Sequence, residues 1–318
     1  MTKVFIDDKA IDWPTQQPLL DVLRQQGYPV AFSCRSGVCQ SCQVRITQGT
    51  PPAAAQAGLT VAQKEKQLVL SCCCYSEQDL GVSLYDPREE QVTAEVLSVT
   101  SLADDIIELR LRAPVAFHGG QYMTLWRDAQ TPRNYSIASA ADDDHLSFHI
   151  QVRPDGQFSR WAKQLSPTDH LSIYGPLGDC HYQPEHSERP LLLAACGTGI
   201  APLYAVAREA LAKGHSHNIH ILYAARSAAR LYWRKPLEQL AQNHAQVRLD
   251  CLILEDPSEG KRKPANVYEF VRSELTGLQN HQIFLCGAPS FVQKMRKQCF
   301  MAGARPRQVC FDAFEAGR

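Results

Sequence analysis

The sequence lacks an excess of charge of either sign. Its 318 residues carry 33 Lys and Arg against 33 Asp and Glu. Proteins that bind nucleic acids or anionic membranes usually carry a surplus of basic residues. This balance argues against nucleic acid or an anionic membrane as the main partner.

Targeting signals and long apolar segments are also scarce. The N-terminus has no apolar core of a secretory signal, so we expect no export. Residues 190–207 carry no charge, and their length alone would suit a membrane span. However, Gly197, Gly199 and Pro202 interrupt this segment in the order of a strand, a glycine turn and a helix start. We therefore predict a buried strand that enters a phosphate-binding loop, and no membrane segment.

Cysteine, by contrast, is abundant, with twelve residues. Without export these thiols stay reduced or bind metal in the cytoplasm. Cys34, Cys39 and Cys42 are spaced C-x-x-x-x-C-x-x-C, and a run at Cys72–Cys74 follows about thirty residues later. This is the ligand spacing of plant-type [2Fe–2S] proteins. Zinc sites usually use paired C-x-x-C knuckles and disulfide frameworks belong to small secreted domains, so we favour an iron–sulfur cluster.

Length and hydrophobic patterning predict three domains of mixed α+β and α/β class. Residues 1–88 contain short strands around one amphipathic helix at 18–26. Short alternating strands in residues 92–186 predict an antiparallel β-barrel. In residues 189–318 apolar strands alternate with helices, which predicts a doubly wound parallel α/β domain. The strands expected in the last two domains are 93–100, 106–111, 121–126, 145–152, 191–195, 218–224, 247–254 and 282–285, and the helices are 158–165, 203–213, 231–243, 266–275 and 290–302.

One segment of the predicted barrel combines three useful side chains, Arg133, Tyr135 and Ser136. An arginine can hold a phosphate with two hydrogen bonds, a tyrosine can stack on a flat ring, and a hydroxyl can donate to a ring nitrogen. Taken alone, the same segment is compatible with an ordinary β-strand.

Two segments of the last domain suit a nucleotide. Gly197-Thr-Gly-Ile-Ala-Pro202 follows a strand and opens a helix, so its glycines let the backbone approach a pyrophosphate. Cys286-Gly287 ends the last predicted parallel strand, and ligands sit at such strand ends. Alone, the glycines indicate only a tight turn, and Cys286 only a buried strand cysteine.

Together and in this order, the motifs resemble the ferredoxin–NAD(P)H reductase superfamily with an N-terminal plant-type ferredoxin, as in reductase components of multicomponent Rieske or di-iron oxygenases. The ferredoxin resemblance covers residues 3–84 and implies a β-grasp fold. It also implies that Cys72, which follows Leu70-Ser71, is the fourth metal ligand. A neighbouring cysteine is the alternative ligand; otherwise Cys73 and Cys74 are packed thiols, since free cysteine behaves as a small hydrophobe.

The resemblance further implies roles for individual residues. Arg133 and Ser159 would bind the FAD pyrophosphate, Tyr135 would stack on the isoalloxazine, and Ser136 would reach its reactive nitrogen. Cys286 would lie near the nicotinamide C4. The expected catalytic residues are Tyr135, Ser136 and Cys286, the expected metal ligands are Cys34, Cys39, Cys42 and Cys72, and the expected cofactor-binding residues are Arg133, Tyr135, Ser136, Gly156, Gln157, Phe158, Ser159, Gly197, Thr198, Gly199, Pro202, Arg226, Cys286, Gly287 and Phe314.

Two positions leave alternatives open. NADH-using relatives often carry an acidic residue where Arg230 stands, and Arg226 and Arg230 would suit a 2′-phosphate unless they face water. We expect NADH, with NADPH as the alternative. Phe314 near the C-terminus either covers the flavin or lies on an edge strand with a frayed end.

The resemblance implies a reductase that passes electrons from NADH through FAD and a [2Fe–2S] cluster to a terminal oxygenase or its ferredoxin. One alternative is a reductase that supplies a deoxysugar dehydratase. Another, of a different class, is a non-catalytic zinc-binding module. We expect a monomer in the cytoplasm.

Overall fold

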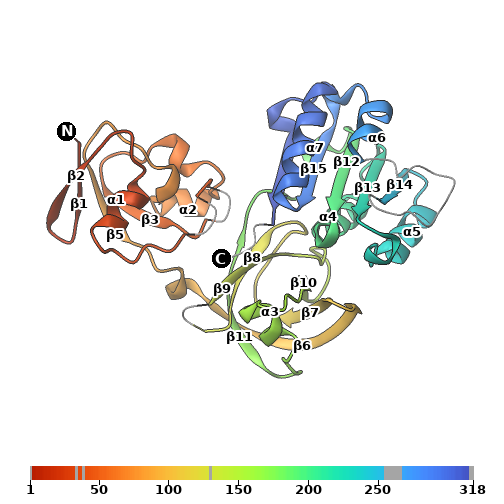
Figure 1. The fold of residues 1–318 in the computed structure, drawn as a ribbon, viewed down its shortest axis with the longest axis horizontal. Coiled ribbons are helices and arrows are strands. Elements are labelled where there is room, and N and C mark those ends of the chain that lie inside the picture. Colours follow the sequence, from red (N-terminus) through yellow and green to blue (C-terminus); the bar gives the residue numbers. More distant parts are fainter. Residues whose placement is uncertain (1, 33–34, 38–39, 129–130, 254–266, 315–318) are drawn as a thin grey trace. The chain divides into compact units, whose positions relative to one another are not determined.

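The computed structural model describes residues 2–32, 35–37, 40–128, 131–253 and 267–314 (Figure 1). The chain forms two compact units, the first built mainly on Met1–Gln91, with Leu177–Asp179, and the second on Val92–Pro176 and Cys180–Glu315. Within the described ranges no helix is both long and apolar enough to cross a membrane.

Unit 1 is a five-stranded mixed sheet with the strand order β2-β1-β5-β3-β4. Strand β1 is antiparallel to β2 and parallel to β5, and β3 is antiparallel to both β5 and β4. The elements are β1 (Thr2–Ile6), β2 (Lys9–Trp13), α1 (Leu19–Gln25), β3 (Gln43–Gln48), α2 (Val61–Glu65), β4 (Leu68–Leu70) and β5 (Leu80–Leu84), with 3-10 turns η1 (Ala53–Gln56), η2 (Ser71–Cys73) and η3 (Pro87–Glu90).

The predicted helix of unit 1 is confirmed as α1, which buries its leucines against the sheet and is followed by Gly27 at φ +83°. Strand β2 was missed. It pairs with β1 through a two-residue turn, Asp7-Asp8, whose φ angles of 47° and 61° are those of a tight hairpin. Asp-Asp is a weaker hairpin signal than Asn-Gly, which is why the sequence did not reveal it.

The first part of unit 2 is a six-stranded sheet with the order β10-β7-β6-β11-β8-β9. Ala138, two residues after β9, donates from its backbone N–H to the Ser147 carbonyl on β10 (2.7 Å), which closes the predicted barrel around an apolar interior. The elements are β6 (Val92–Ala103), β7 (Ile106–Arg112), β8 (Tyr122–Trp126), β9 (Pro132–Ser136), β10 (Leu146–Gln151), α3 (Gln157–Ala162) and β11 (His170–Leu177).

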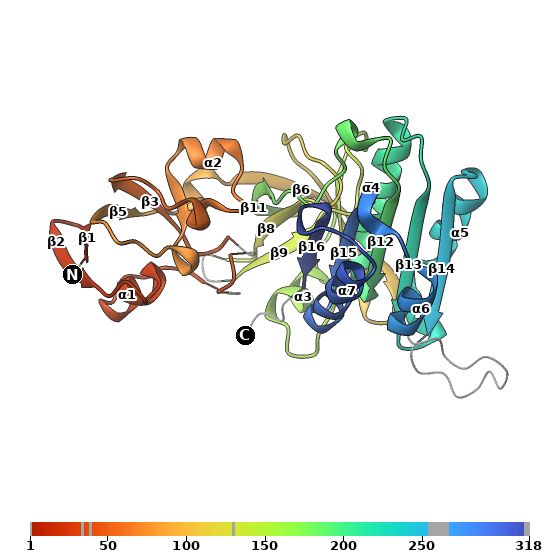
Figure 2. The same ribbon diagram turned by 90° about the horizontal axis from the view of Figure 1, so that it is seen from above.

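The second part of unit 2 is a parallel sheet, and Figure 2 shows its strands in the order β14-β13-β12-β15-β16. Helices α4 and α5 pack in one hydrophobic cluster and α6 and α7 in another, so the predicted doubly wound architecture is confirmed. The elements are η4 (Pro184–His186), β12 (Leu191–Cys196), η5 (Gly197–Gly199), α4 (Ile200–Ala212), β13 (Ile219–Ala225), η6 (Ala228–Arg230), α5 (Arg234–Asn243), β14 (Val247–Ile253), α6 (Val267–Glu274), η7 (Leu278–Asn280), β15 (Gln282–Gly287), α7 (Pro289–Met301), η8 (Pro306–Gln308) and β16 (Val309–Ala313).

Candidate redox centres

The sheet of unit 1 brings two of the predicted metal ligands together. Cys42 precedes β3 and Cys72 follows β4, and these strands pair with Gln43 opposite Leu70. The backbone N–H and the hydroxyl of Ser71 both donate to the Cys42 carbonyl, at 3.0 and 2.7 Å. These bonds extend the antiparallel ladder by one residue. Two cysteines far apart in sequence therefore become neighbours.

The thiols of Cys42 and Cys72 are close enough to interact. A hydrogen bond with Cys42, and then burial, raise the pKa of the Cys72 thiol far above its ordinary value. Neighbouring buried thiols resist ionising together, whereas a metal centre stabilises the thiolate forms. This pair therefore fits a metal cluster. The other two predicted ligands, Cys34 and Cys39, lie outside the described residues.

The structure distinguishes Cys72 from the two cysteines that follow it. Cys73 Sγ lies 3.6 Å from Cys72 Sγ. A Cβ atom added to Gly37, which has φ +80°, would lie 3.0 Å from Cys73 Sγ, so Cys73 packs against the backbone of the cysteine loop. Cys74 is fully buried in the core, and burial foremost raises its pKa to about 12. Cys74 packs in the core beside α1, where its carbonyl accepts from the Leu19 N–H (2.9 Å), whereas Cys72 contacts Cys42; this difference in position favours Cys72 as the ligand.

Uncharged amides hold the backbone next to Cys42. Gln40 is buried and has a φ of 54°. Its Nε2 donates to the Gly58 carbonyl (2.7 Å), and its Oε1 accepts from Gln63 Nε2 (3.1 Å) and Gln43 Nε2 (3.3 Å). We call Gln40, Gln43 and Gln63 the amide network. No pattern in the sequence predicted the amide network.

Gln63 is itself fixed at the start of α2. Its Oε1 accepts from the Thr60 N–H (2.9 Å), and its own N–H donates to Thr60 Oγ1 (3.3 Å). This reciprocal arrangement is a capping box. The amide network is therefore anchored to a helix end as well as to the loop.

In the barrel, Tyr135 lies on β9 with its ring 5.3 Å from that of Phe158. Burial raises the pKa of Tyr135, while the positive charges of Arg133 and Arg153 act in the opposite direction. Two guanidinium groups therefore lie near Tyr135, as a pyrophosphate would need. Arg153 follows β10 and was not predicted; its nearest sequence signal is the turn that leads into Gly156.

The turn at Gly156 is ordered by Ser159. The hydroxyl of Ser159 accepts from the Arg153 N–H (3.1 Å) and donates to the Gly156 carbonyl (3.4 Å). Gln157 is exposed. Phe158 is a core residue of the barrel with only 1% of its surface exposed, so its side chain does not face a ligand and only its backbone is available to one.

Two loops meet at the ends of β12 and β15. A Cβ atom at Gly199 would lie 2.4 Å from the Cys286 carbonyl oxygen, and one at Gly287 would lie 2.6 Å from Cys196 Sγ. These approaches require glycine at both positions. The predicted pyrophosphate loop, with Thr198 in it and Pro202 in the first turn of α4, is thus in direct contact with Cys286-Gly287.

A hydrogen bond joins the barrel to the nucleotide sheet at this point. Ser136 Oγ at the end of β9 donates to Asp312 Oδ2 on β16 (2.5 Å), and Asp312 pairs with Cys286 in the β15–β16 register. Burial raises the pKa of Asp312, and the bond from Ser136 opposes that rise. Burial also raises the pKa of Cys286, whose side chain is almost fully enclosed. We call Ser136, Cys286 and Asp312 the junction.

Asp312 was not predicted as a site residue. It stands in the C-terminal segment that had been singled out for Phe314. The N–H of Phe314 donates to the Gly287 carbonyl (2.8 Å), so this residue continues the edge strand β16 alongside the nucleotide loop. Its predicted contact with the flavin stays a prediction.

Of the two arginines after β13, one has a structural partner. Arg230 Nη1 lies 2.7 and 2.6 Å from the two carboxylate oxygens of Asp105 in the barrel. Arg226 directly follows the end of β13 and is exposed. The two arginines therefore differ, because Arg230 is held by a carboxylate of the barrel and Arg226 lies exposed at the end of β13.

Helix α4 fastens the barrel to the nucleotide domain. Arg208 forms two hydrogen bonds with Asp143, at 2.7 and 2.8 Å. The next residue, Glu209, accepts from the Gly119 N–H (2.9 Å) and contacts His118 Nδ1 (2.6 Å). Burial alone would raise the pKa of Glu209, but hydrogen bonds from Lys213, Gly119 and His118 hold it below its usual value. These contacts join the barrel to the nucleotide domain within unit 2.

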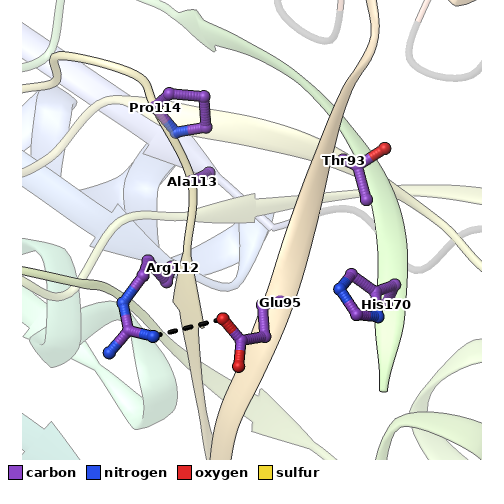
Figure 3. A pocket seen from close by; sticks show the side chains of 6 residues that line it. All are labelled: Thr93, Glu95, Arg112, Ala113, Pro114 and His170. Atoms are coloured by element: carbon purple, nitrogen blue, oxygen red, sulfur yellow. Dashed lines mark hydrogen bonds and ion pairs between the residues drawn. The ribbon is translucent and has the colours of Figure 1, made fainter. Parts of the chain in front are cut away.

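A shallow pocket opens elsewhere on the barrel (Figure 3). An ion pair between Arg112 and Glu95 (3.1 Å) spans part of it. None of the predicted cofactor residues lines this pocket, whose lining is Thr93, Glu95, Arg112, Ala113, Pro114 and His170. This pocket is therefore not part of the predicted redox site.

Three protein families match successive parts of the chain. Residues 4–77 match the 2Fe-2S iron-sulfur cluster binding domain, residues 93–182 the oxidoreductase FAD-binding domain, and residues 193–297 the oxidoreductase NAD-binding domain.

Similar proteins share this order over their whole length. The reductase component of the naphthalene 1,2-dioxygenase system of Pseudomonas putida is 28% identical, with 98% of this chain and 97% of the relative covered. Reductase component 2 of terephthalate 1,2-dioxygenase from Comamonas sp is 28% identical over 99% and 98% of the two chains. The crystal structure of an Amycolatopsis cytochrome P450 reductase has a TM-score of 0.68 at 27% identity and covers 99% of each chain. The chain therefore combines a 2Fe-2S iron-sulfur cluster binding domain with oxidoreductase FAD-binding and NAD-binding domains, and it is an NAD(P)H-dependent iron–sulfur flavoprotein reductase.

Proposed function

We propose that this protein passes electrons from NADH, through FAD and a [2Fe–2S] cluster, to a partner oxygenase. The main support for the proposal is the junction, in which three separate strands bring Ser136, Cys286 and Asp312 together. The same chain pairs Cys42 with Cys72 in unit 1. When bound, FAD accepts a hydride from the nicotinamide and the cluster carries electrons one at a time. The protein sets their distance and orientation.

In unit 1 the proposed metal ligands are Cys34, Cys39, Cys42 and Cys72. The strand pairing that juxtaposes Cys42 and Cys72 supports this set, as does the full burial of Cys74. We also propose the domain boundaries 1–88, 92–186 and 189–318, which the change of compact unit after Gln91 supports at the first boundary.

In unit 2 the proposed flavin contacts come from the barrel. Arg133 and Arg153 would hold the pyrophosphate with the turn that Ser159 orders, and Tyr135 would lie against the flavin ring. Ser136 would donate to the reactive nitrogen. Because the hydroxyl has one proton, it would turn from Asp312 to the reactive nitrogen when FAD is bound, and protonated Asp312, which burial favours, would then donate to the serine oxygen.

The nucleotide contacts come from the ends of the parallel strands. The backbone at Gly197, Thr198 and Gly199 would bind the pyrophosphate, with Gly287 and Cys286 beside the nicotinamide. Because Arg230 is engaged by Asp105, only Arg226 is left for the adenine ribose. A 2′-phosphate usually needs more positive charge than one arginine, so we propose NADH as the preferred donor.

The names of the relatives support an oxygenase, or its ferredoxin, as the acceptor. Two are reductase components of dioxygenase systems, and one solved relative is a cytochrome P450 reductase. The names of these relatives give no support to a deoxysugar dehydratase. The family that matches unit 1 binds 2Fe-2S, which leaves no support for a zinc module. A monomeric state and a cytoplasmic location stay predictions.

The order of electron flow is tested by Cys72→Ser. We expect the variant to lose the visible absorbance of the cluster while NADH-driven ferricyanide reduction stays intact, because a flavin can serve that acceptor directly. Reduction of cytochrome c should fall by about tenfold or more, since it needs the cluster. Steady-state rates with both acceptors, together with iron content, give the answer.

Cys73→Ser is the matched control, because its sulfur lies beside that of Cys72 but packs against Gly37. It should keep the cluster and both activities. If ferricyanide reduction collapsed equally in a folded, FAD-loaded Cys72→Ser protein, the proposed order would be wrong.

A further inference from the structure

An unusual arrangement of aromatic and charged side chains lies on unit 1. The ring of Phe32 is 38% exposed. The guanidinium carbon of Arg24 lies 4.4 Å from the ring centroid, and that of Arg35 lies 4.7 Å from it. We call Arg24, Phe32 and Arg35 the arginine–phenylalanine patch. It presents an apolar ring held between two cations at the surface.

Both arginines of the patch are held in place. Arg24, in the last turn of α1, donates from Nη1 to the Val30 carbonyl (3.1 Å). Arg35 Nη2 lies 2.9 Å from Asp21 Oδ1 in an ion pair whose side chains are 49% and 27% exposed. Exposed pairs of this kind contribute little to stability, so fold stability alone does not explain why the side chain of Arg35 is ordered here.

The charge of the patch is positive. Asp21 is the one acidic residue paired with it in the described part of the chain, and it compensates only one of the two arginines. Arg24 forms no ion pair with a carboxylate among the residues that the structure describes. The patch and Asp21 together therefore carry a net charge of about +1, next to an exposed aromatic ring.

The patch flanks the first predicted metal ligand in the sequence. Phe32 stands two residues before Cys34, and Arg35 follows it directly. A protein that takes electrons from the cluster must approach the surface around its ligands. Arginine and aromatic side chains are enriched at the centres of protein interfaces, where they contribute most of the binding energy.

We infer that the arginine–phenylalanine patch is the docking surface for an electron-acceptor protein that presents carboxylates around a small apolar contact. The inference rests on the proposed function. Each NADH is oxidised to NAD⁺ and a proton, and its two electrons reduce two acceptor irons from Fe³⁺ to Fe²⁺. The patch supplies no atom to this transfer; it steers and holds the acceptor.

Two forms of cytochrome c separate the effect of the acceptor's surface charge from the effect of its haem. Native cytochrome c is basic, and succinylated cytochrome c is acidic with the same haem. For Arg24→Glu we expect the reduction of succinylated cytochrome c to fall about tenfold at low ionic strength, with little loss or a gain for the native form. The difference should shrink as salt is added. Arg24→Gln should show a smaller effect of the same sign.

Lys9→Glu is the matched charge control, since Lys9 is exposed on the β1–β2 hairpin, away from β3 and β4 in the sheet order. Its effect on either cytochrome should stay within about twofold. Absorbance of the cluster and ferricyanide reduction, which should be unchanged in every variant, verify that the protein is intact.

A binding measurement needs no turnover. Calorimetric titration of the oxidised holoprotein with oxidised succinylated cytochrome c should show weaker binding for Phe32→Ala, by about fivefold or more. Phe5→Ala is the control, because Phe5 has nearly the same exposure, 39% against 38% for Phe32, but lies on β1.

Two results would overturn the docking surface. One is an equal effect of Arg24→Glu and Lys9→Glu, and the other is an equal effect on the two cytochromes. Failure of the proposed function looks different, because the wild-type protein would then reduce ferricyanide but neither cytochrome. The calorimetric titration would still test in that case whether the arginine–phenylalanine patch binds an acidic acceptor.

Discussion

In unit 1 uncharged amides hold the backbone beside Cys42, whereas in unit 2 ion pairs hold the barrel against the nucleotide domain. The amide network of Gln40, Gln43 and Gln63 contains no formal charge. The contacts of α4 include the Asp143–Arg208 pair and the buried carboxylate of Glu209. Each region thus orders its part of the electron path by a different kind of hydrogen bond.

The difference follows from what each region must position. A cluster held by four thiolates is negatively charged, and a full charge buried beside it would change its potential and its affinity for iron. Neutral amides fix the loop without that side effect. At the interface of two domains, ion pairs between facing surfaces fix a single orientation and disfavour wrong ones. The charged contacts are thus used where orientation matters most.

The largest effect is expected where a charge belongs to the redox site itself. Asp312→Asn removes the carboxyl group that accepts from Ser136, and Ser136→Ala removes the donor. Either should slow the reduction of bound FAD by NADH roughly 10²-fold, while the spectrum of the cluster is unchanged. Stopped-flow absorbance measures this step. Because the residues share one hydrogen bond, the double variant should be about as slow as the slower single variant, and fully additive losses would contradict the shared role.

A charge introduced into the amide network should lower the stability of unit 1 and leave the rate of FAD reduction unchanged. Gln63→Glu replaces the donor to Gln40 Oε1 by a second oxygen, with both side chains buried. We expect unit 1 to lose about 2 kcal/mol of stability and to release iron to a chelator faster. Gln78→Glu, at an exposed position of unit 1, should do neither. A normal rate of FAD reduction in the Gln63→Glu protein is expected, and a slowed one would show that the effect is not local.

The smallest effect concerns pH. His149 on β10 is packed against Trp233 and Tyr232 of the nucleotide domain, and burial lowers its pKa to about 4. The unfolded chain takes up a proton near the ordinary value of about 6.5, so the stability of unit 2 falls as pH drops between these values. The loss should be about 1 kcal/mol between pH 7 and 5.5. His149→Gln should remove it from the pH dependence of unfolding.

The comparison of the two units supplies the control for this prediction. Every histidine of the chain follows residue 91, so unit 1 contains none. Its unfolding transition should therefore be unaffected by histidine titration in the same pH range. A pH dependence that His149→Gln left unchanged would assign the effect to another group.

The sequence predicted most of the elements because their side chains repeat with a regular period. Strand β7 and helix α7 differ from the expected ranges by one residue at the ends. The hairpin at Asp7-Asp8 was missed because its turn lacks a typical signal. The mixed order of the sheet in unit 1 came from the resemblance rather than from the pattern.

Contacts between residues far apart in the chain could not be predicted from the sequence. Ser136 and Asp312 are 176 residues apart, and only the position of β16 beside β15 brings them together. Arg230 suited a phosphate by residue type, but Asp105, 125 residues away, pairs with it. Which groups share a hydrogen bond depends on the sheet order, and local propensity does not contain that information.

Helix α4 has a consequence for how such proteins diversify. It starts directly after the glycine loop, and Arg208 and Glu209 lie about 12 Å further along its axis. The length of the helix therefore fixes the distance and the rotation between the nucleotide loop and the residues that contact the barrel. One inserted residue would move everything beyond it by about 1.5 Å and turn it by about 100°. A change of length between relatives should consequently be tolerated less within α4 than in the loop that joins α4 to β13.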